Sequence, residues 1–304
     1  MRYKHIFGPV PSRRLGISLG VDLVTHKICS LDCIYCECGK TTQLTHEPKE
    51  YVKFKDVIKE LDHYWQHNPD PDYITFSGSG EPTLNSRLVD VIDYIKDKRP
   101  HIKVAVLTNA TLFTEPVIRR GVLKADLVIP SLDAVSKKTF ARINRPGSSF
   151  DVGRIVKGIK AFSKEYKGAL WLEILILPGI NDSPSDLIKL KETIREIDPD
   201  QVQINTLDRP GTLSDLKPAT RRELENVIKI LDFHRIEIIA RVGKSIKGHV
   251  KRKDIKEAII ETIHRRPCTK EDLLNILNVE KEDIDRQISL LEKEKKIIGK
   301  SQER

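Results

Sequence analysis

The sequence predicts an α/β protein built on a parallel β-sheet, followed by a small helical domain. Two observations predict the sheet: short, β-branched, almost continuously apolar segments recur along residues 17–232, and they alternate with segments of helical periodicity. A third observation, a strongly basic stretch that begins near Arg241, predicts where this domain ends. Such alternation is typical of right-handed βαβ units, in either an open doubly wound sheet or a barrel, and periodicity does not choose between them.

Six segments are predicted to be strands of this sheet. They are residues 17–21, 73–76, 103–107, 127–130, 171–177 and 201–205. Between them, apolar residues spaced i, i+3, i+4 and i+7 predict the buried faces of four helices. These faces are Phe54, Val57, Ile58 and Leu61; Leu88, Val91, Ile92 and Ile95; Val152, Ile155, Val156 and Ile159; and Leu224, Val227, Ile228 and Leu231.

The C-terminal part predicts a separate small domain behind a basic linker. Between residues 241 and 256, seven Lys or Arg residues oppose one Asp, a net charge of +6. Beyond this stretch we expect helices over 255–264, from the cap Thr269 to 277, and over 280–295, with a hairpin-like tail at Ile297. The predicted division is therefore a barrel or open-sheet domain over 1–240, a linker over 241–253 and a winged-helix-like domain over 254–304.

Composition excludes several classes of protein. The 304 residues are 39% hydrophobic and 32% charged, and no stretch approaches the roughly 20 apolar residues of a membrane span. The N-terminus has no apolar core of a secretory signal, so we expect a soluble, cytoplasmic protein. The net charge of +9 permits an anionic partner without requiring one.

The cysteines are the strongest chemical signal in the chain. Cys29, Cys33, Cys36 and Cys38 lie within ten residues, and the first three have the spacing C-x3-C-x2-C in a loop after the first strand. A tight group in a cytoplasmic chain indicates a metal site. Three thiolates on a 4Fe–4S cluster leave one iron open to another ligand. Zinc held by all four cysteines is an alternative, although zinc sites usually pair two separated knuckles; a disulfide or free thiols are further alternatives.

A glycine-rich turn follows the second predicted strand. It reads Phe76-Ser77-Gly78-Ser79-Gly80-Glu81-Pro82-Thr83, and its paired glycines allow close approach of the backbone to a small polar ligand. By itself such a sequence is more often an ordinary turn before a helix, here one beginning near Ser86. It is not a phosphate-binding P-loop, because no Gly-Lys-Ser/Thr follows.

Together, the cysteine spacing, the aromatic Tyr35 before the third cysteine, and Gly-Ser-Gly-Glu-Pro after the second strand resemble the radical S-adenosylmethionine (SAM) superfamily. The opening Phe7-Gly8-Pro9-Val10-Pro11-Ser12-Arg13-Arg14-Leu15-Gly16 is similar to its wyosine-synthase-related group, and the resemblance covers residues 7–208. It implies a partial (β/α)6, TIM-like barrel, in agreement with the six predicted strands. It also implies a 4Fe–4S cluster on Cys29, Cys33 and Cys36, with SAM chelating the open iron.

The resemblance further implies contacts to SAM, residue by residue. Gly78, Ser79, Gly80 and Glu81 would hold the methionine amino group, and Tyr35 would contact adenine. Asn109 and Ser131, which end the third and fourth strands, would face the methionine or ribose part. Leu177, with the Pro178-Gly179 that follows it, would pack on adenine. The carboxyl ends of barrel strands are where active sites collect.

The implied reaction begins with an electron from a donor such as ferredoxin or flavodoxin. Reductive cleavage of SAM gives a 5'-deoxyadenosyl radical, which abstracts hydrogen from an unidentified substrate, either an RNA base or a peptide or protein. Wyosine synthases carry additional N-terminal cysteines for a second cluster, and no cysteine precedes Cys29 here, so their tRNA base-forming reaction is not expected. No acid–base residue is assigned.

Other interpretations of single features stay open. Gly16-Ile17-Ser18-Leu19-Gly20 matches G-x-S-x-G, but its serine lies within a predicted strand, which disfavours a hydrolase. Arg13 and Arg14 are candidates to hold a substrate phosphate or the SAM carboxylate, or are solvated surface residues. Cys38 has no assigned role. The alternative function is a metal-cluster-dependent nucleic-acid-binding regulator, although the acidic start of the third C-terminal helix disfavours DNA contact.

Overall fold

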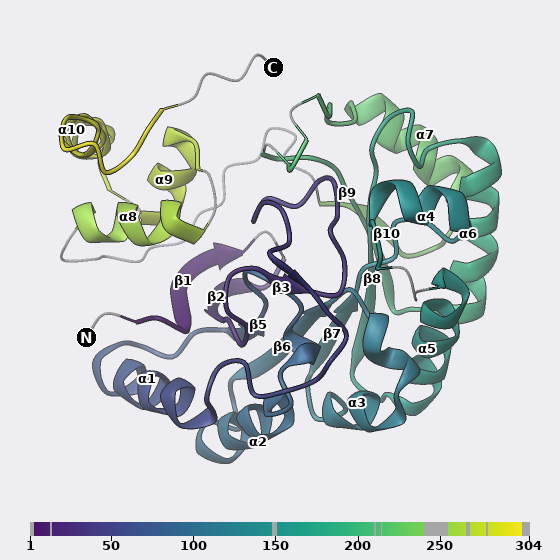
Figure 1. Cartoon of the computed structure of the whole chain (residues 1–304), viewed down its shortest axis with the longest axis horizontal. Helices are drawn as coiled ribbons and strands as arrows, with labels where there is room; N and C mark the ends of the chain where they lie inside the picture. Colours follow the sequence, from purple (N-terminus) through teal and green to yellow (C-terminus); the bar gives the residue numbers. More distant parts are fainter. Residues whose placement is uncertain are drawn as a thin grey trace.

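A curved, mostly parallel sheet forms the centre of the molecule. The computed structural model describes residues 3–299, apart from 13, 148–150, 210, 214, 240–254, 266–267 and 278. Eight strands lie in the order β1-β2-β5-β6-β7-β8-β9-β10, and Figure 1 shows helices along their outer side. Every neighbouring pair is parallel except β1 with β2. Among the described residues no pairing joins β1 to β10, so the barrel is partial.

The strands of this sheet agree closely with those expected. They are β1 (Ile6–Ser12), β2 (Gly16–Val21), β5 (Tyr73–Phe76), β6 (Lys103–Thr108), β7 (Leu127–Pro130), β8 (Ala169–Leu175), β9 (Gln201–Asn205) and β10 (Ile236–Ile238). All six predicted strands are present. The bounds of β8 were predicted two residues too late, because Asn181 ends the strand: its side chain accepts from the Leu177 backbone N–H at 2.8 Å and donates to the Leu175 carbonyl at 2.7 Å.

The two strands of this sheet that were not predicted, β1 and β10, are its edges. Strand β1 contains Pro9 and Pro11, which lack the N–H that an interior strand needs; an edge strand tolerates them. Its start is fixed by the buried Glu60 of α1 (Phe54–His67), whose carboxylate accepts from the backbone N–H groups of Lys4, His5 and Ile6 at 2.8 to 3.0 Å. A helix thus holds one edge of the barrel.

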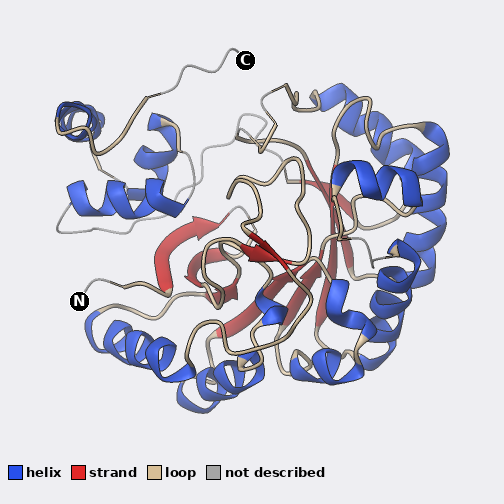
Figure 2. Ribbon diagram, in the orientation of Figure 1, coloured by secondary structure: helices blue, strands red, loops and turns tan. Residues whose placement is uncertain are grey.

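Helices cover the convex face of the sheet, as Figure 2 shows. In addition to α1 they are α2 (Leu88–Lys98), α3 (Pro116–Gly121), α4 (Lys137–Ile143), α5 (Val152–Glu165), α6 (Pro184–Ile197) and α7 (Arg221–Leu231), with short 3-10 turns η1 (Pro82–Leu84) and η2 (Thr111–Thr114). The four predicted apolar faces lie on α1, α2, α5 and α7 and pack into the core.

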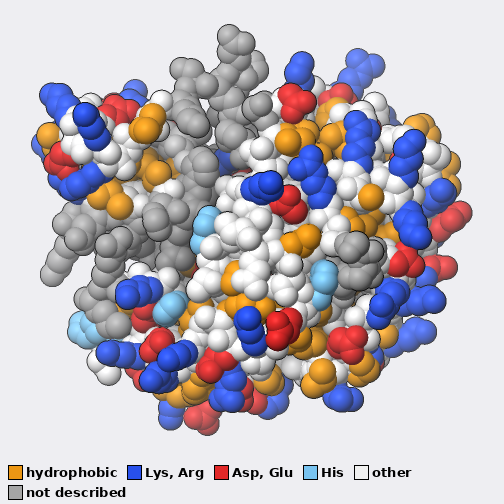
Figure 3. Space-filling model, viewed as in Figure 1, with side chains coloured by type: hydrophobic (Ala, Val, Ile, Leu, Met, Phe, Trp, Pro, Cys, Tyr) orange, Lys and Arg blue, Asp and Glu red, His pale blue; other side chains and the backbone are white. Residues whose placement is uncertain are grey.

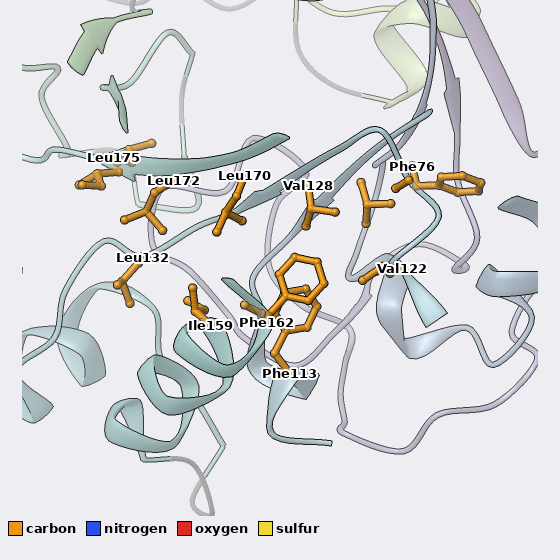
Figure 4. Packing of buried hydrophobic residues seen from close by; sticks show 14 of the residues in the cluster. Phe76, Phe113, Val122, Val128, Leu132, Ile159, Phe162, Leu170, Leu172 and Leu175 are labelled. Carbon is orange, nitrogen blue, oxygen red and sulfur yellow. The ribbon is translucent and has the colours of Figure 1, made fainter. Parts of the chain in front are cut away.

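The main core lies between the sheet and these helices. Figure 4 shows Phe162 of α5 and Phe113 of η2 packed beneath Val128 and Leu170 of neighbouring strands. A smaller apolar cluster fills the other face of the sheet, where Leu15 covers residues of β6 and β7. The filled interior fixes the strands, so the loops at their carboxyl ends are held on a rigid frame.

Three helices follow the barrel, as predicted: α8 (Ile255–Arg265), α9 (Lys270–Leu277) and α10 (Lys281–Lys293). They share a separate apolar cluster, and Val10 of β1 packs against it. The predicted cap is present, since Thr269 Oγ1 accepts from the Asp272 backbone N–H at 3.1 Å. Described residues 294–299 form no strand, so the winged-helix assignment is not confirmed; the predicted linker lies outside the described residues.

Charged side chains are spread over the outer helices. On the face in Figure 3, Lys and Arg side chains in blue lie among Asp and Glu side chains in red around the rim. The excess positive charge is therefore interspersed with negative charge over the described part of this face. No helix among the described residues is long and apolar enough to span a membrane.

Candidate metal centre and glycine turn

The candidate metal ligands lie on one loop that crosses the carboxyl ends of the strands. This cysteine loop, residues 28–39, begins at β3 (Ile28–Cys29), which pairs with β4 (Gln43–Leu44). The backbone N–H of Glu81 donates to the Ile28 carbonyl at 3.2 Å and ties the loop to the turn after β5. Figure 1 shows the purple β3 segment in front of the central strands. Cys29, Cys33 and Cys36 are free, half-buried thiols.

Two side-chain amides point at two of these sulfurs. Asn109 Nδ2 donates to Cys29 Sγ at 3.6 Å, and Asn144 Nδ2 donates to Cys33 Sγ at 3.4 Å. Such donors stabilise thiolate charge and tune iron–sulfur clusters. Without a metal, burial and nearby Glu81 raise the pKa of Cys29 to about 11, and burial and nearby Asp133 raise the pKa of Cys33.

The third thiol has the opposite tendency. A hydrogen bond from Cys38 and the ammonium of Lys27 lower the pKa of Cys36 to about 6, against the effect of burial. The same hydrogen bond, together with burial, raises the pKa of Cys38, whose Sγ lies 3.5 Å from the Gly78 carbonyl oxygen. Cys38 is therefore a neighbour of both the loop thiols and the glycine turn.

Three thiols on one loop are donors of the kind that a 4Fe–4S cluster takes. The cysteine ligands of a 4Fe–4S cluster bind different irons, so they surround the cluster without converging. Three free thiols on one loop, two of them facing amide donors, fit that requirement.

The glycine turn, residues 77–83, is shaped by close backbone contacts. Gly78 has φ +136°, and a Cβ there would lie 2.5 Å from Asp22 Cγ. A Cβ on Gly80 would lie 1.9 Å from the Ile28 carbonyl oxygen. Asp22, directly after β2, accepts from the backbone N–H of Ser79 at 3.0 Å and from its hydroxyl. Glycine at position 80 therefore allows the turn to lie against the start of the cysteine loop, and glycine at position 78 allows it to lie against Asp22.

Glu81 anchors this turn to the next strand. Its buried carboxylate accepts from Thr83 N and Oγ1, from Thr108 Oγ1, and from Asn109 N at 2.7 Å. Burial raises its pKa, and these hydrogen bonds oppose that rise. The carboxylate thus fixes the position of Asn109, whose own side chain bonds Ser30, Thr111 and Cys29.

The remaining expected SAM contacts lie around the same edge of the barrel. Ser131 is half-buried directly after β7 and pairs with Glu173 of β8. The Leu177 side chain is fully buried in the core, so only the half-buried Pro178 and the exposed Gly179 present that segment to solvent. The Tyr35 hydroxyl donates to Asp133 Oδ2 at 2.6 Å, and burial beside this carboxylate raises the pKa of Tyr35.

Several site residues were not predicted from the sequence. Asp133 joins four elements by accepting from Tyr35, from Asn144 Nδ2 at 2.8 Å and from the Leu175 backbone N–H at 2.9 Å. Its position three residues beyond β7, close to Ser131, was the only available signal. Asp22, Lys27 and Asn144 gave no recognisable motif.

Of the two N-terminal arginines, the structure describes only Arg14. Arg14 is not a solvated surface residue: its Nη1 donates to Glu173 Oε2 and to Gln203 Oε1, both at 2.5 Å. This ion pair joins the β1–β2 turn to strands β8 and β9 across the interior of the barrel. Arg13 lies outside the described residues.

Comparisons with known proteins agree with this geometry. The family model of the radical SAM superfamily matches residues 23–190, more than half of the chain. The chain is 33% identical over 280 residues to a UPF0026 protein of Methanocaldococcus jannaschii, covering 90% of this chain and 85% of that protein. It is 38% identical over 271 residues to a Brachyspira hyodysenteriae protein named GTPase Obg, covering 88% of this chain but only 40% of that longer protein.

Solved structures show the same fold at low sequence identity. TYW1 with a lysine-pyruvate adduct bound superposes with a TM-score of 0.55 at 18% identity, covering 75% of this chain and 76% of that one. SuiB of Streptococcus suis bound to the precursor peptide SuiA gives 0.54 at 16% identity, covering 72% and 48%. With its cysteine loop, glycine turn and partial barrel, this chain belongs to the radical SAM superfamily, whose enzymes use a 4Fe–4S cluster and SAM.

Proposed function

We propose that this enzyme holds a 4Fe–4S cluster on Cys29, Cys33 and Cys36, cleaves SAM reductively, and abstracts hydrogen from an RNA base or from a peptide or protein. The observation that carries the proposal is the juxtaposition of three free thiols with the glycine turn at the carboxyl ends of the strands. When bound, the cluster supplies the electron that breaks SAM into methionine and a 5'-deoxyadenosyl radical.

The residues of the turn are proposed to bind the methionine amino group through their backbone. Gly78 is exposed, and its carbonyl oxygen is already approached by the Cys38 thiol at 3.5 Å, so it can accept a hydrogen bond. Ser79 is held by Asp22, and Glu81 is fully engaged with its own neighbours. The Glu81 carboxylate is therefore proposed to act by holding the turn rigid, which lowers the conformational entropy that the turn loses when SAM binds.

The adenine and ribose contacts are proposed to come from the strand ends around the loop. Asp133 fixes the Tyr35 ring by its hydroxyl, so the ring and adjacent backbone are held beside Cys36. Ser131 lies half-buried at the end of β7, and Pro178 and Gly179 offer the accessible surface next to Leu177. Asn109 is proposed to act through Cys29 and the turn, because its amide is bonded to both Ser30 and Thr111.

The first experiment measures the chemistry directly. The full chain, reconstituted anaerobically with iron and sulfide, should bind about four irons and release 5'-deoxyadenosine from SAM when dithionite is added. Cys33→Ala should abolish this product. Cys268→Ala is the matched control, because Cys268 is also a half-buried cysteine but packs among the C-terminal helices, and it should retain activity. Product from Cys33→Ala at the wild-type rate, or zinc in place of iron, would refute the ligand assignment.

A second arm tests the substrate class. The net charge of +9 supports an RNA substrate, since lysine and arginine provide sequence-independent attraction to phosphates. The peptide-bound SuiB structure supports a peptide substrate on the same fold. Adding total tRNA or a peptide extract to the reaction should stimulate 5'-deoxyadenosine release with one of them. Stimulation by RNA that falls steeply with salt would favour RNA, and stimulation by peptide alone would exclude it.

A further inference from the structure

A buried lysine directly precedes the cysteine loop, and its side chain bonds to the end of that loop. Lys27 is only 3% exposed, although lysine is rarely buried without a partner. Its Nζ donates to the Gly39 carbonyl oxygen at 2.9 Å, and against the effect of burial the pKa of Lys27 is raised, chiefly by Cys36. Its backbone is fixed too: its N–H donates to Thr42 Oγ1 at 2.9 Å, and its carbonyl accepts from Thr42 N at 3.0 Å. The ammonium is therefore held between the first and last parts of the loop.

Within the part of the chain that the structure describes, no carboxylate pairs with this ammonium. Among the described residues, Lys27 Nζ makes no ion pair with Asp or Glu within 4.0 Å, whereas buried ammonium groups normally need a counter-charge. The groups that favour the ammonium form of Lys27, against the effect of burial, are Cys36, Cys29 and Cys33. The loop thus carries one buried positive charge whose natural partners are the three proposed cluster ligands.

The other buried charges near the ligands are negative. Glu81 acts on Cys29, and Asp133 acts on Cys33. Both carboxyl groups disfavour additional negative charge on the sulfurs, and Lys27 favours it. Lys27 lowers the pKa of both Cys29 and Cys36, so it favours negative charge on these two sulfurs.

We propose that Lys27 is a positioning residue for electron transfer: its buried ammonium stabilises the reduced cluster and raises its reduction potential. The inference rests on the proposed function. The step is the transfer of one electron from a reductant of the ferredoxin or flavodoxin class to the cluster, with no bond broken and no proton moved. The electron makes a cluster with three thiolates more negative, and a fixed positive charge in a poorly solvated site lowers the free energy of that state.

Three substitutions separate charge from shape. Lys27→Gln removes the charge but keeps a donor for the Gly39 carbonyl, Lys27→Met keeps the length alone, and Lys27→Arg keeps the charge. Lys40→Met is the matched control, because Lys40 belongs to the same part of the chain but is exposed to solvent. Each full-length variant is reconstituted anaerobically, and the cluster is titrated with a reductant in the absence of SAM while the reduced cluster is followed by electron paramagnetic resonance.

The expected result is a lower reduction potential in the two neutral variants. We expect Lys27→Gln and Lys27→Met to reduce the equilibrium constant for one-electron reduction at least about tenfold, which corresponds to about 59 mV. Lys27→Arg and Lys40→Met should stay close to wild type, because one keeps the buried charge and the other removes a charge that water screens.

Specific results overturn the proposal. An unchanged potential in Lys27→Gln, or an equal change in Lys40→Met, would show that the buried charge does not set the potential. Loss of the cluster from both neutral variants would make Lys27 a requirement for loop assembly instead. If the wild-type chain itself fails to assemble an iron–sulfur cluster, the proposed function fails, and this outcome is distinct from an assembled cluster with an unchanged potential.

Discussion

A buried ion-pair network between the barrel and the C-terminal helices provides the sharpest stability prediction. Arg209, in the segment after β9, donates from Nε and Nη2 to Asp272 Oδ2 in α9 at 3.1 and 3.0 Å, and from Nη1 to Glu37 Oε2 at 2.9 Å. Only 3% of the Arg209 side chain and 1% of the Asp272 side chain are exposed. Since Glu37 lies between Cys36 and Cys38, the network links α9 to the cysteine loop.

Asp272→Asn tests this network while keeping an oxygen acceptor for the cap of α9, where Thr269 N donates to Asp272 Oδ2. Removing one partner of a buried pair typically costs about 3 to 5 kcal/mol, because the other charge stays buried. Here Glu37 still pairs with Arg209, so we expect the lower end, about 3 kcal/mol. The control, Arg221→Met, breaks a pair with Glu225 whose side chains are 66% and 49% exposed, which should cost about 0.5 kcal/mol or less.

Amide hydrogen exchange is the suitable assay, because it reports the opening of each part separately. A loss of about 3 kcal/mol should accelerate exchange in α9 by more than about a hundredfold, since each 1.4 kcal/mol is a factor of ten. A smaller acceleration should extend to the cysteine loop. Exchange in α9 that changes no more than in the Arg221→Met control would refute the claim that the network couples the two parts.

Three further predictions concern the glycine turn, the edge strand and a helix contact. Gly80→Ala should abolish SAM binding measured by calorimetry, because the added Cβ would lie 1.9 Å from the Ile28 carbonyl oxygen. The control Gly121→Ala, whose Cβ would have its nearest neighbour at 3.7 Å, should bind SAM normally. Equal binding by both variants would contradict the packing argument. Glu60→Ala should destabilise the fold by about 2 to 4 kcal/mol in denaturant unfolding, because three backbone N–H groups at the start of β1 lose their acceptor, and a loss under about 0.5 kcal/mol would oppose this role. Hydrogen bonds from Arg119 lower the pKa of Glu165, so the stability that this carboxylate contributes is complete above its unfolded pKa of about 4.3 and is lost as the pH falls below that value. The difference in Tm between wild type and Glu165→Gln should therefore shrink between about pH 6 and about pH 3. A constant difference would be evidence against this ion pair as the cause.

Local patterns in the sequence were sufficient for most of the frame. Six interior strands and the apolar helix faces follow from side-chain periodicity, which is set within a few residues. The cysteine loop and glycine turn are likewise contiguous motifs, so their chemistry was predictable before their positions were known. The three C-terminal helices were predicted by the same periodicity and by the cap at Thr269.

The edges of the sheet and the support of the site depended on tertiary structure. Strand β1, with two prolines, resembles a loop in sequence, and only an edge position with Glu60 as its anchor makes it a strand. Tyr35 and its partner Asp133 are 98 residues apart, and Arg209 is 172 residues from Glu37. Whether such polar residues are solvated or buried against one partner depends on which loops the partial barrel brings together. The free energy of that burial has no local signature in the chain.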